Sequence, residues 1–252
     1  MKTEWDYTQL ADAYLKRPDY APDALNRIFA VSGLKKGDKV CDIGAGVGHL
    51  TLPLASFGAE VDSVEPNDAM RANGVKRTAE FANVSWSEGT GEATGRPGGQ
   101  YDLVTFGSSF NVCDRQKALA ETSRLLKPGK WFACLWNHRD LDDKIQKRIE
   151  AIIAANIPGY SYGARREDQS RIIEACGLFE DICQFEGKIE WEQGVQDVLE
   201  AWRSHATLQR QAKEKFAAII GQIGEFLVGL NTETIMIPYT TRVWMARKKA
   251  EA

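Results

Sequence analysis

The stretch VCDIGAGVGHL, residues 40–50, places a short apolar strand and an aspartate before three closely spaced glycines. Glycine has no Cβ, so Gly44, Gly46 and Gly48 allow a ligand to approach the backbone where a strand passes into a helix. Ligands of open α/β sheets bind beyond the carboxyl ends of the strands. The stretch therefore predicts an α/β fold with a ligand site at the end of strand 39–43.

Alternating strand and helix patterns surround this loop through the first two thirds of the chain. The predicted strands are 39–43, 60–65, 83–86, 101–106 and 131–136. The predicted helices are 22–31, 49–56, 68–80 and 114–126, and KPGK (127–130) is predicted to be a turn. Strands separated by helices form βαβ units, so we expect a doubly wound, mostly parallel sheet with helices on both faces.

The last third of the chain has a different pattern, which we interpret as mainly helical insertions. Helices are predicted over 141–155, over about ten residues from Val195, and over 207–230 as one long helix. Strands are predicted over 181–191 and 233–247. Pro238 lies within the second of these strands and predicts a bulge or an edge position, because proline cannot donate a backbone hydrogen bond.

Composition limits the classes of function. The 252 residues, 43% of them hydrophobic and 27% charged, suit one globular domain. The net charge of −3 leaves no basic footprint for nucleic acid. Five cysteines without a CxxC pair and three scattered histidines predict no metal site, and favour free thiols in a reducing cytoplasm. No apolar window could span a membrane and MKTEWDYTQL lacks a signal-peptide core, so we expect a cytoplasmic protein.

The residues around the glycines narrow the choice of ligand. The spacing is G-x-G-x-G, and His49 stands where a dinucleotide-binding loop has its third glycine. Asp42 would repel a pyrophosphate but suits a cationic ligand. Glu65 follows about twenty residues on, the separation at which a carboxylate holds ribose hydroxyls. S-adenosylmethionine carries an ammonium, a sulfonium and a ribose, and is the predicted ligand.

Residues 10–136 resemble the class I S-adenosylmethionine-dependent methyltransferases. VCDIGAGVGHL is similar to their first motif and VEPNDAM (64–70) to the second, whose acidic residue holds the ribose. EGTGEATG (88–95) falls where their adenine loop lies, and QYDLVTFGSSFN (100–111) and ALAETSRLLKPGKWF (118–132) resemble their later motifs. YLKRPDY (14–20) is similar to the start of the small-molecule branch, type 11-like, which includes the ubiquinone- and trans-aconitate-type enzymes.

The resemblance implies a Rossmann-like sheet of seven strands, mostly parallel, with an antiparallel C-terminal strand and a helical lid. We expect a single domain, 1–252, made of a cap segment (1–33), a cofactor-binding core (34–137), lid elements that build the acceptor pocket (138–232) and the final strand (233–247). The cofactor would be S-adenosylmethionine and the product S-adenosylhomocysteine. The expected cofactor-binding residues are Tyr14, Arg17, Asp42, Gly44, Ala45, Gly46, Gly48, Glu65, Pro66, Met70, Gly91, Glu92, Gly107 and Ser108.

The acceptor site is expected where strands four and five end. His138 is the candidate general base because the ordinary pKa of histidine lies near neutrality, and Arg139 is a candidate for binding a carboxylate or phosphate. The alternative is structural, with Asp140 capping a helix that starts at Leu141 and Arg139 solvated or ion-paired. The candidate substrate residues are Phe110, Asn111, Asn137, Arg139, Tyr160, Tyr162, Arg165, Trp202, His205 and Tyr239.

Several of these candidates also have a structural interpretation. Phe110 and Asn111 would equally form a polar loop with one core aromatic. Trp202 fits the apolar stripe of its helix and His205 could cap a helix end, while Arg165 lies in a run of charged residues. Together, the aromatic residues and arginines hint at a planar or anionic acceptor.

We therefore expect methyl transfer to an oxygen or nitrogen of a small-molecule acceptor. The alternative is a methyltransferase-like module that binds the cofactor without turnover, in a regulatory or structural role. A nicotinamide oxidoreductase is disfavoured by the glycine spacing and by the lack of a second catalytic domain. No nucleic acid or membrane partner is expected, and the chain would be a monomer or a homodimer.

Overall fold

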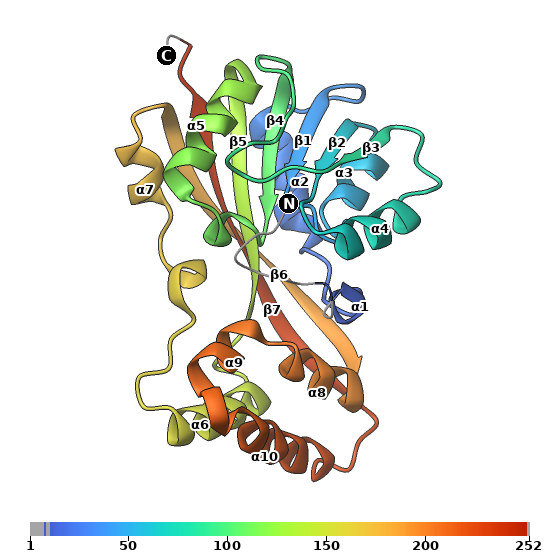
Figure 1. Ribbon diagram of the computed structural model, residues 1–252, viewed down its shortest axis with the longest axis vertical. Coiled ribbons are helices and arrows are strands. Elements are labelled where there is room, and N and C mark those ends of the chain that lie inside the picture. Colours follow the sequence, from blue (N-terminus) through green and yellow to red (C-terminus); the bar gives the residue numbers. More distant parts are fainter. Residues whose placement is uncertain (1–7, 9–10, 251–252) are drawn as a thin grey trace.

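A seven-stranded sheet organises the protein, whose computed structural model describes residue 8 and residues 11–250 (Figure 1). Most of the MKTEWDYTQL start therefore lies outside the described residues. The strand order is β3-β2-β1-β4-β5-β7-β6. The strands are β1 (Lys39–Ile43), β2 (Glu60–Val64), β3 (Val84–Ser87), β4 (Tyr101–Gly107), β5 (Leu126–Arg139), β6 (Phe179–Gly194) and β7 (Thr234–Lys248). The expected fold class is confirmed.

The first five strands are parallel, and β7 runs antiparallel to both β5 and β6. The order along the sheet reverses at β1, where β2 lies on one side and β4 on the other. Such a reversal leaves a crevice beyond the carboxyl ends of the two central strands. The glycine loop follows β1 directly and therefore lies at this crevice.

Side chains alternate between two cores, one on each face of the sheet. Along β5, Ala133 and Leu135 face α2 (Pro22–Ser32) and α3 (Thr51–Phe57), whereas Phe132, Cys134 and Trp136 face α5 (Arg115–Leu125) and α7 (Ser170–Ala175). The period of two is that of a strand buried on both faces. The remaining core helix is α4 (Asp68–Arg77), and the short helix α1 (Ala11–Tyr14) contacts it.

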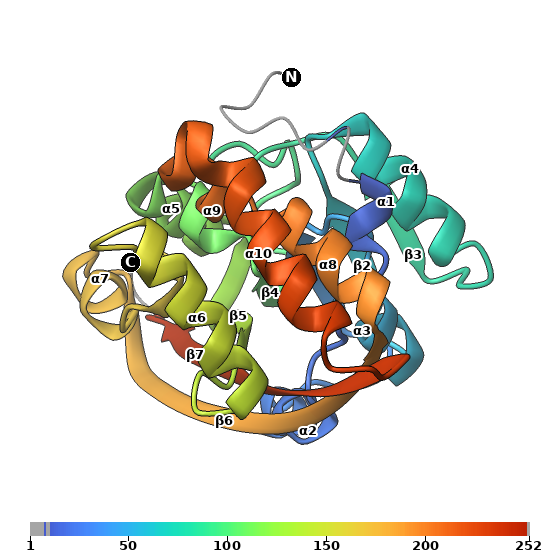
Figure 2. The ribbon, with the colours of Figure 1, turned by 90° about the horizontal axis from the view of Figure 1, so that it is seen from below.

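The lid has a hydrophobic core of its own. It is formed by α6 (Lys144–Asn156), α8 (Val195–Arg203), α9 (Ala206–Ala212) and α10 (Phe216–Val228), with the lid ends of β6 and β7. Figure 1 shows these helices gathered at one end of the sheet, where β6 and β7 extend beyond the other strands, and Figure 2 shows the four helices from that end. Of the segment 138–232, these four helices lie at that end, whereas α7 packs beside α5 on one face of the sheet.

Three local predictions differ from the structure. The single helix expected over 207–230 is divided into α9, the 3-10 turn Lys213–Lys215 and α10, because Lys213 adopts φ 49° and ψ −122°. KPGK is continuous with β5, and Gly129 at φ 71° absorbs the irregular pairing between β4 and β5. Pro238 lies in an internal strand, but pairing of β7 with β5 ends at Tyr239, so Pro238 is paired only with β6.

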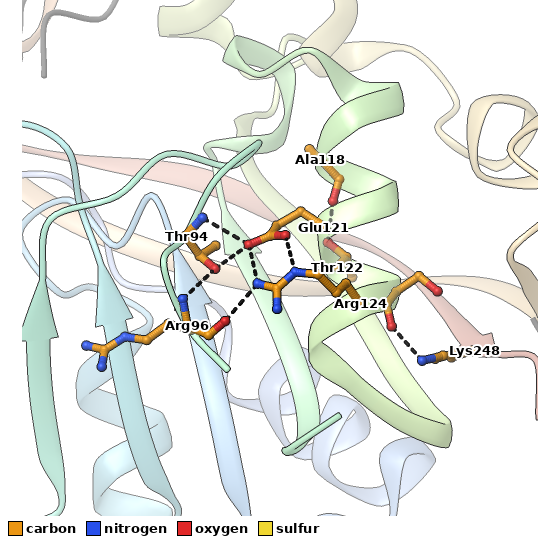
Figure 3. Close-up of polar contacts among 8 residues, drawn as sticks. Thr94, Arg96, Ala118, Glu121, Thr122, Arg124 and Lys248 are labelled. Carbon is orange, nitrogen blue, oxygen red and sulfur yellow. Dashed lines mark hydrogen bonds and ion pairs between the residues drawn. The ribbon is translucent and has the colours of Figure 1, made fainter. Parts of the chain in front are cut away.

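A polar cluster around Glu121 joins the loop before β4 to α5 (Figure 3). The Glu121 carboxylate accepts hydrogen bonds from Thr94 N and from the Nε of Arg124, at 3.0 and 2.7 Å. Arg124 in turn donates to the Arg96 carbonyl at 2.7 Å. These bonds hold the pKa of Glu121 at about 2. They fix the loop before β4 against α5.

No helix among the described residues has the length and apolar composition needed to cross a membrane.

Candidate active site

Backbone hydrogen bonds fix the glycine loop against the end of β2. The amides of Gly44 and Ala45 donate to the Val64 carbonyl at 2.8 and 3.1 Å. The amide of Gly46 donates to Oε2 of Glu65 at 2.9 Å, and Oε1 of the same carboxylate accepts the Asn67 amide at 2.8 Å. The glycine loop and Glu65, which the sequence spacing predicts to serve the same ligand, are thus in direct contact.

The three glycines have different tasks. Gly44 has φ 63°, and a Cβ there would lie 2.4 Å from Cβ of Ser109, so Gly44 permits the loops after β1 and β4 to meet. Gly46 has φ 58° and lines the cavity, and no heavy atom lies within 4 Å of the position of its missing Cβ. Gly48 has φ 87°, packs next to Trp86 and does not line the cavity. Only the first two border the space for a ligand, and Gly48 serves the turn.

The two acidic residues of the first and second motifs are both buried. Asp42 accepts hydrogen bonds from Thr51 Oγ1 and Thr105 Oγ1 at 2.8 and 2.9 Å. Burial and the nearby Glu65 raise the pKa of Asp42 to about 7. Burial also raises the pKa of Glu65 above its ordinary value. Burial makes each carboxylate harder to ionise. A cationic ligand would stabilise the ionised form of both carboxylates, so the site favours a cationic partner.

A cavity of about 490 Å³ opens at this crevice and continues to the lid. Its core half is lined by nearly all of the residues expected to bind the cofactor: Tyr14, Arg17, Asp42, Gly44, Ala45, Gly46, Glu65, Pro66, Met70, Gly91, Glu92, Gly107 and Ser108. The sequence pattern therefore located residues that the fold brings together from five separate segments of the chain.

The segment between α1 and α2 closes one side of the cavity. Its backbone is tied to the glycine loop through His49, whose ring nitrogens lie 2.8 Å from the Tyr14 carbonyl and 3.1 Å from Oδ1 of Asp19. The Arg17 guanidinium stacks on the Tyr14 ring, with Cζ 3.5 Å from the ring centroid. Lys16 reaches across to α8, where its ammonium pairs with Asp197 and Glu200 at 2.8 and 2.6 Å. The segment thus joins the core to the lid.

The lid half of the cavity is lined by aromatic residues and cations. Of the expected residues it contains Asn137, His138, Arg139, Tyr162, Arg165, His205 and Tyr239. Arg139 Cζ lies 4.4 Å from the Trp202 ring centroid and 5.9 Å from that of Tyr239. The expected alternative for Arg139, a solvated or ion-paired side chain, differs from this stacked arrangement.

His138 lies on β5, 3% exposed, and neither ring nitrogen has a hydrogen-bond partner among the described residues. Burial, and then the charges of Arg165, Arg166 and Arg242, lower its pKa to about 3. The ring is therefore neutral at physiological pH. Its candidacy as a base was argued from an ordinary histidine pKa, and that argument does not hold for this environment.

Replacing His138 with glutamine should reduce the acid sensitivity of folding. Between pH 6.5 and about 3 the unfolded chain binds a proton at His138 that the folded chain does not. The buried neutral ring therefore costs no stability above pH 6.5, and the free energy of unfolding decreases as the pH falls from 6.5 towards 3. Over this interval the free energy of unfolding of His138→Gln should fall less steeply than that of the original protein, by up to about 1.4 kcal/mol per pH unit.

Urea denaturation at several pH values measures this difference. Other titrating groups act equally in both proteins, so the comparison isolates His138. Parallel curves over this pH range would show that the folded protein protonates His138 as readily as the unfolded chain does.

His205 is neutral as well, and its hydrogen bonding fixes the tautomer. Its Nδ1 accepts the Leu208 amide at 3.2 Å and so caps α9, which leaves the proton on Nε2. Burial and the charges of Arg165 and Arg139 lower its pKa well below the ordinary value. The ring stacks on Trp202, with centroids 5.1 Å apart. His205 therefore caps a helix, but the helix is α9, which follows it, and not α8, which precedes it.

Four candidate substrate residues do not line the cavity. Phe110 is fully buried among Phe106 and Phe132, and Asn111 accepts the indole N–H of Trp136 at 2.8 Å. Both belong to the 3-10 turn Phe110–Val112, of which only Val112 lines the cavity. Trp202 is fully buried in the lid core, as its helical spacing suggested, and Tyr160 packs against the same core. For Phe110, Asn111 and Trp202 the structure agrees with the structural interpretation.

Two polar residues of the run after strand five have structural tasks. The Asn137 amide donates to the carbonyls of Pro18 and Asp19 and accepts from Thr241, so its polar atoms are occupied although it lines the cavity. Asp140 does not cap the next helix: α6 begins at Lys144, and the Asp143 carboxylate accepts the amides of Ile145 and Gln146, both at 3.0 Å. The predicted cap was three residues early.

Several lining residues were not expected from the sequence. They include Lys16, Tyr20, His49, Asn67 and Gln193. Tyr20 shares a hydrogen bond of 3.1 Å with Ser108 Oγ, and its presence in YLKRPDY was the available signal. Gln193 donates to the Lys16 carbonyl at 2.7 Å from the far end of β6, a contact that no local pattern indicates.

Comparison with known proteins agrees with this geometry. Residues 41–134 match the family described as "Methyltransferase domain", type 11. The part of the chain that contains the glycine loop and Glu65 therefore matches a methyltransferase family. It is similar to the ubiquinone/menaquinone biosynthesis C-methyltransferase of Psychromonas ingrahamii, with 34% identity over 105 residues, 39% of this chain and 42% of that enzyme. The chain thus matches less than half the length of this relative.

Solved structures extend the similarity of fold to the whole chain. A proposed type II methyltransferase from Anaeromyxobacter dehalogenans superposes with a TM-score of 0.63 at 18% identity, covering 92% of this chain and 98% of that one. Phosphoethanolamine N-methyltransferase 2 of Haemonchus contortus, in complex with phosphomonomethylethanolamine and S-adenosylhomocysteine, gives 0.52 at 18% identity, over 89% of this chain and 52% of that chain. At this identity the likeness concerns the fold alone.

Proposed function

We propose that the protein transfers a methyl group from S-adenosylmethionine to an oxygen or nitrogen of a small-molecule acceptor. The observation that carries the proposal is the single cavity, whose core half is formed by the methyltransferase motifs and whose lid half is formed by a separate set of side chains. One cavity that joins two chemically different halves suits a reaction between two bound molecules.

The residues of the core half fit the cofactor. Gly46 leaves open space in the loop, and the Glu65 carboxylate is anchored by two amides, with lone pairs left for the ribose hydroxyls. Asp42 and Glu65 provide a buried acidic environment for its positive charge. By the family resemblance, Tyr14 and Arg17 would bind its carboxylate, and Pro66, Met70, Gly91 and Glu92 would surround the adenine.

The bound cofactor supplies an electrophilic methyl group with a neutral leaving group. The protein then has to hold the acceptor in line with that methyl group and exclude water. In this proposal, Tyr239 and Tyr162 form walls and the neutral His205 donates from Nε2. His138 is the candidate to take a proton from the acceptor. A negatively charged acceptor beside the arginines would raise its pKa towards the range of a general base.

Calorimetry with S-adenosylhomocysteine tests the cofactor assignment, and product formation from labelled S-adenosylmethionine tests turnover. We expect stoichiometric binding and methyl transfer to a small molecule from a panel of acids, phenols and amines. Lack of S-adenosylhomocysteine binding by the folded protein would refute the proposal. Binding without turnover of any panel member would instead favour a cofactor-binding module, which the connected lid half of the cavity disfavours.

A further inference from the structure

Two arginines in the lid half of the cavity form no ion pair with any described residue. Within residue 8 and residues 11–250, no carboxylate lies within ion-pairing distance of Arg139 or Arg165, and the Nε atoms of both are buried without a hydrogen bond. Arg165 donates only a long bond of 3.4 Å, to the Asn137 carbonyl. Buried charges in proteins are ordinarily paired, because an unpaired charge loses hydration without compensation.

The other cations of the cavity are accounted for. Lys16 is paired with Asp197 and Glu200. Arg166 donates to the Arg139 carbonyl at 2.9 Å, stacks on Tyr162 and lies near the charge of Glu150. Arg17 is assigned to the cofactor carboxylate in the proposed function. The Glu150 charge also acts on Arg139, but neither Arg139 nor Arg165 forms an ion pair with a described residue.

The surroundings of the two arginines hold them in place without using their donors. Arg139 lies between the rings of Trp202 and Tyr239, which attract a cation through their π faces and do not accept its N–H groups. Burial and the charges of Arg17 and Arg139 lower the pKa of Arg165 to about 10, so it stays charged at neutral pH. His138, 3% exposed and without partners, borders the same space and adds polar atoms but no counter-charge.

The cavity is therefore electrically divided. Its core half holds Asp42, Glu65, Glu92 and Asp114, whereas its lid half holds the arginines, although the chain as a whole carries a net charge of −3. The core end of the cavity is thus negatively charged and the lid end positively charged. This arrangement matches a cationic cofactor at the core end and an anion at the lid end.

We propose that Arg139 and Arg165 bind an oxyanion group, a carboxylate or a phosphate, of a methyl acceptor that carries two negative charges. The inference rests on the proposed function and specifies the acceptor of the same site. Guanidinium groups suit this task because their forked donors match the oxygens of both groups. Two negative charges would balance the two unpaired arginines.

The test uses the full chain saturated with S-adenosylhomocysteine and two small dianions as probes, malonate and inorganic phosphate. Unfolding temperature is measured against probe concentration at constant ionic strength, with neutral malonamide for comparison. We expect a saturable rise for at least one dianion and none for malonamide. The dianion with the higher apparent affinity identifies the bound group as carboxylate or phosphate.

Variants locate the response. Arg139→Gln and Arg165→Gln should each weaken the apparent affinity by about tenfold or more, since each removes a charged hydrogen-bonding partner. Arg148→Gln, which alters an exposed arginine on lid helix α6, is the matched control and should behave as the original protein. Calorimetry with S-adenosylhomocysteine verifies that each variant is folded.

The outcomes separate this inference from the proposed function. If S-adenosylhomocysteine binds but neither dianion gives a saturable rise, or malonamide acts equally, the anion site is refuted and the proposed function stands. The same conclusion follows if folded Arg139→Gln and Arg165→Gln respond as Arg148→Gln does. If S-adenosylhomocysteine does not bind, the proposed function itself is refuted.

Discussion

Replacing Glu65 with glutamine should lower the affinity for S-adenosylhomocysteine by about a hundredfold or more. In the proposed complex, the carboxylate accepts charged hydrogen bonds from two ribose hydroxyls, each contributing about 1.5–3 kcal/mol. Glutamine keeps the size of the side chain but has one accepting oxygen and no charge. It also presents an amide to one of the two backbone N–H groups that Glu65 now accepts, those of Gly46 and Asn67. Isothermal titration calorimetry measures the change.

The matched control is Glu60→Gln, which makes the same chemical change at the exposed start of the same strand. Its affinity for S-adenosylhomocysteine should equal that of the original protein. A Glu65→Gln protein that is folded and binds S-adenosylhomocysteine within threefold of the original would show that the acidic residue after β2 does not hold the ribose.

Replacing Trp202 with alanine should destabilise the protein by about 3–5 kcal/mol, the usual cost of removing a large aromatic side chain from a core. Trp202 is fully buried in the lid core, and its ring also stacks on His205 and Arg139. The variant should therefore lose dianion binding as well as stability. Affinity for S-adenosylhomocysteine should change little, because Trp202 does not line the cavity and its contacts belong to the lid.

Trp202→Phe is the control, since phenylalanine keeps an aromatic face for Arg139 and fills part of the volume. It should retain dianion binding more closely than alanine does, and lose less stability in urea denaturation. Equal loss of dianion binding in both variants would mean that the Trp202 ring does not support Arg139 through its π face.

The cofactor half of the site was accessible from sequence for a physical reason. Gly44, Gly46 and Glu65 occupy fixed positions relative to strand ends, and the strand ends themselves follow from short apolar runs. The sheet places successive strand ends at one edge, so local patterns there become spatial neighbours. Thirteen of the fourteen expected cofactor residues line the cavity, and the exception, Gly48, serves the turn in the same loop.

The acceptor half depended on contacts between distant segments. The sequence does not decide that the Phe110 side chain turns into the core and that Asn111 bonds to Trp136. The same holds for Lys213, whose backbone breaks a helix that the apolar stripe predicts as continuous. In each case tertiary packing overrides a local preference, because the burial of neighbouring residues outweighs the preference of a single one.

The sequence by itself determined the doubly wound sheet, the position of the glycine loop and the acidic residue that faces it. These depend on periodicity and spacing along the chain. Only the tertiary structure decided the charge state of His138 and left Arg139 and Arg165 without an ion pair among the described residues. Those properties arise from burial and from charges that β5, the segment before α7 and β7 bring together, and electrostatic interactions depend on distance in space.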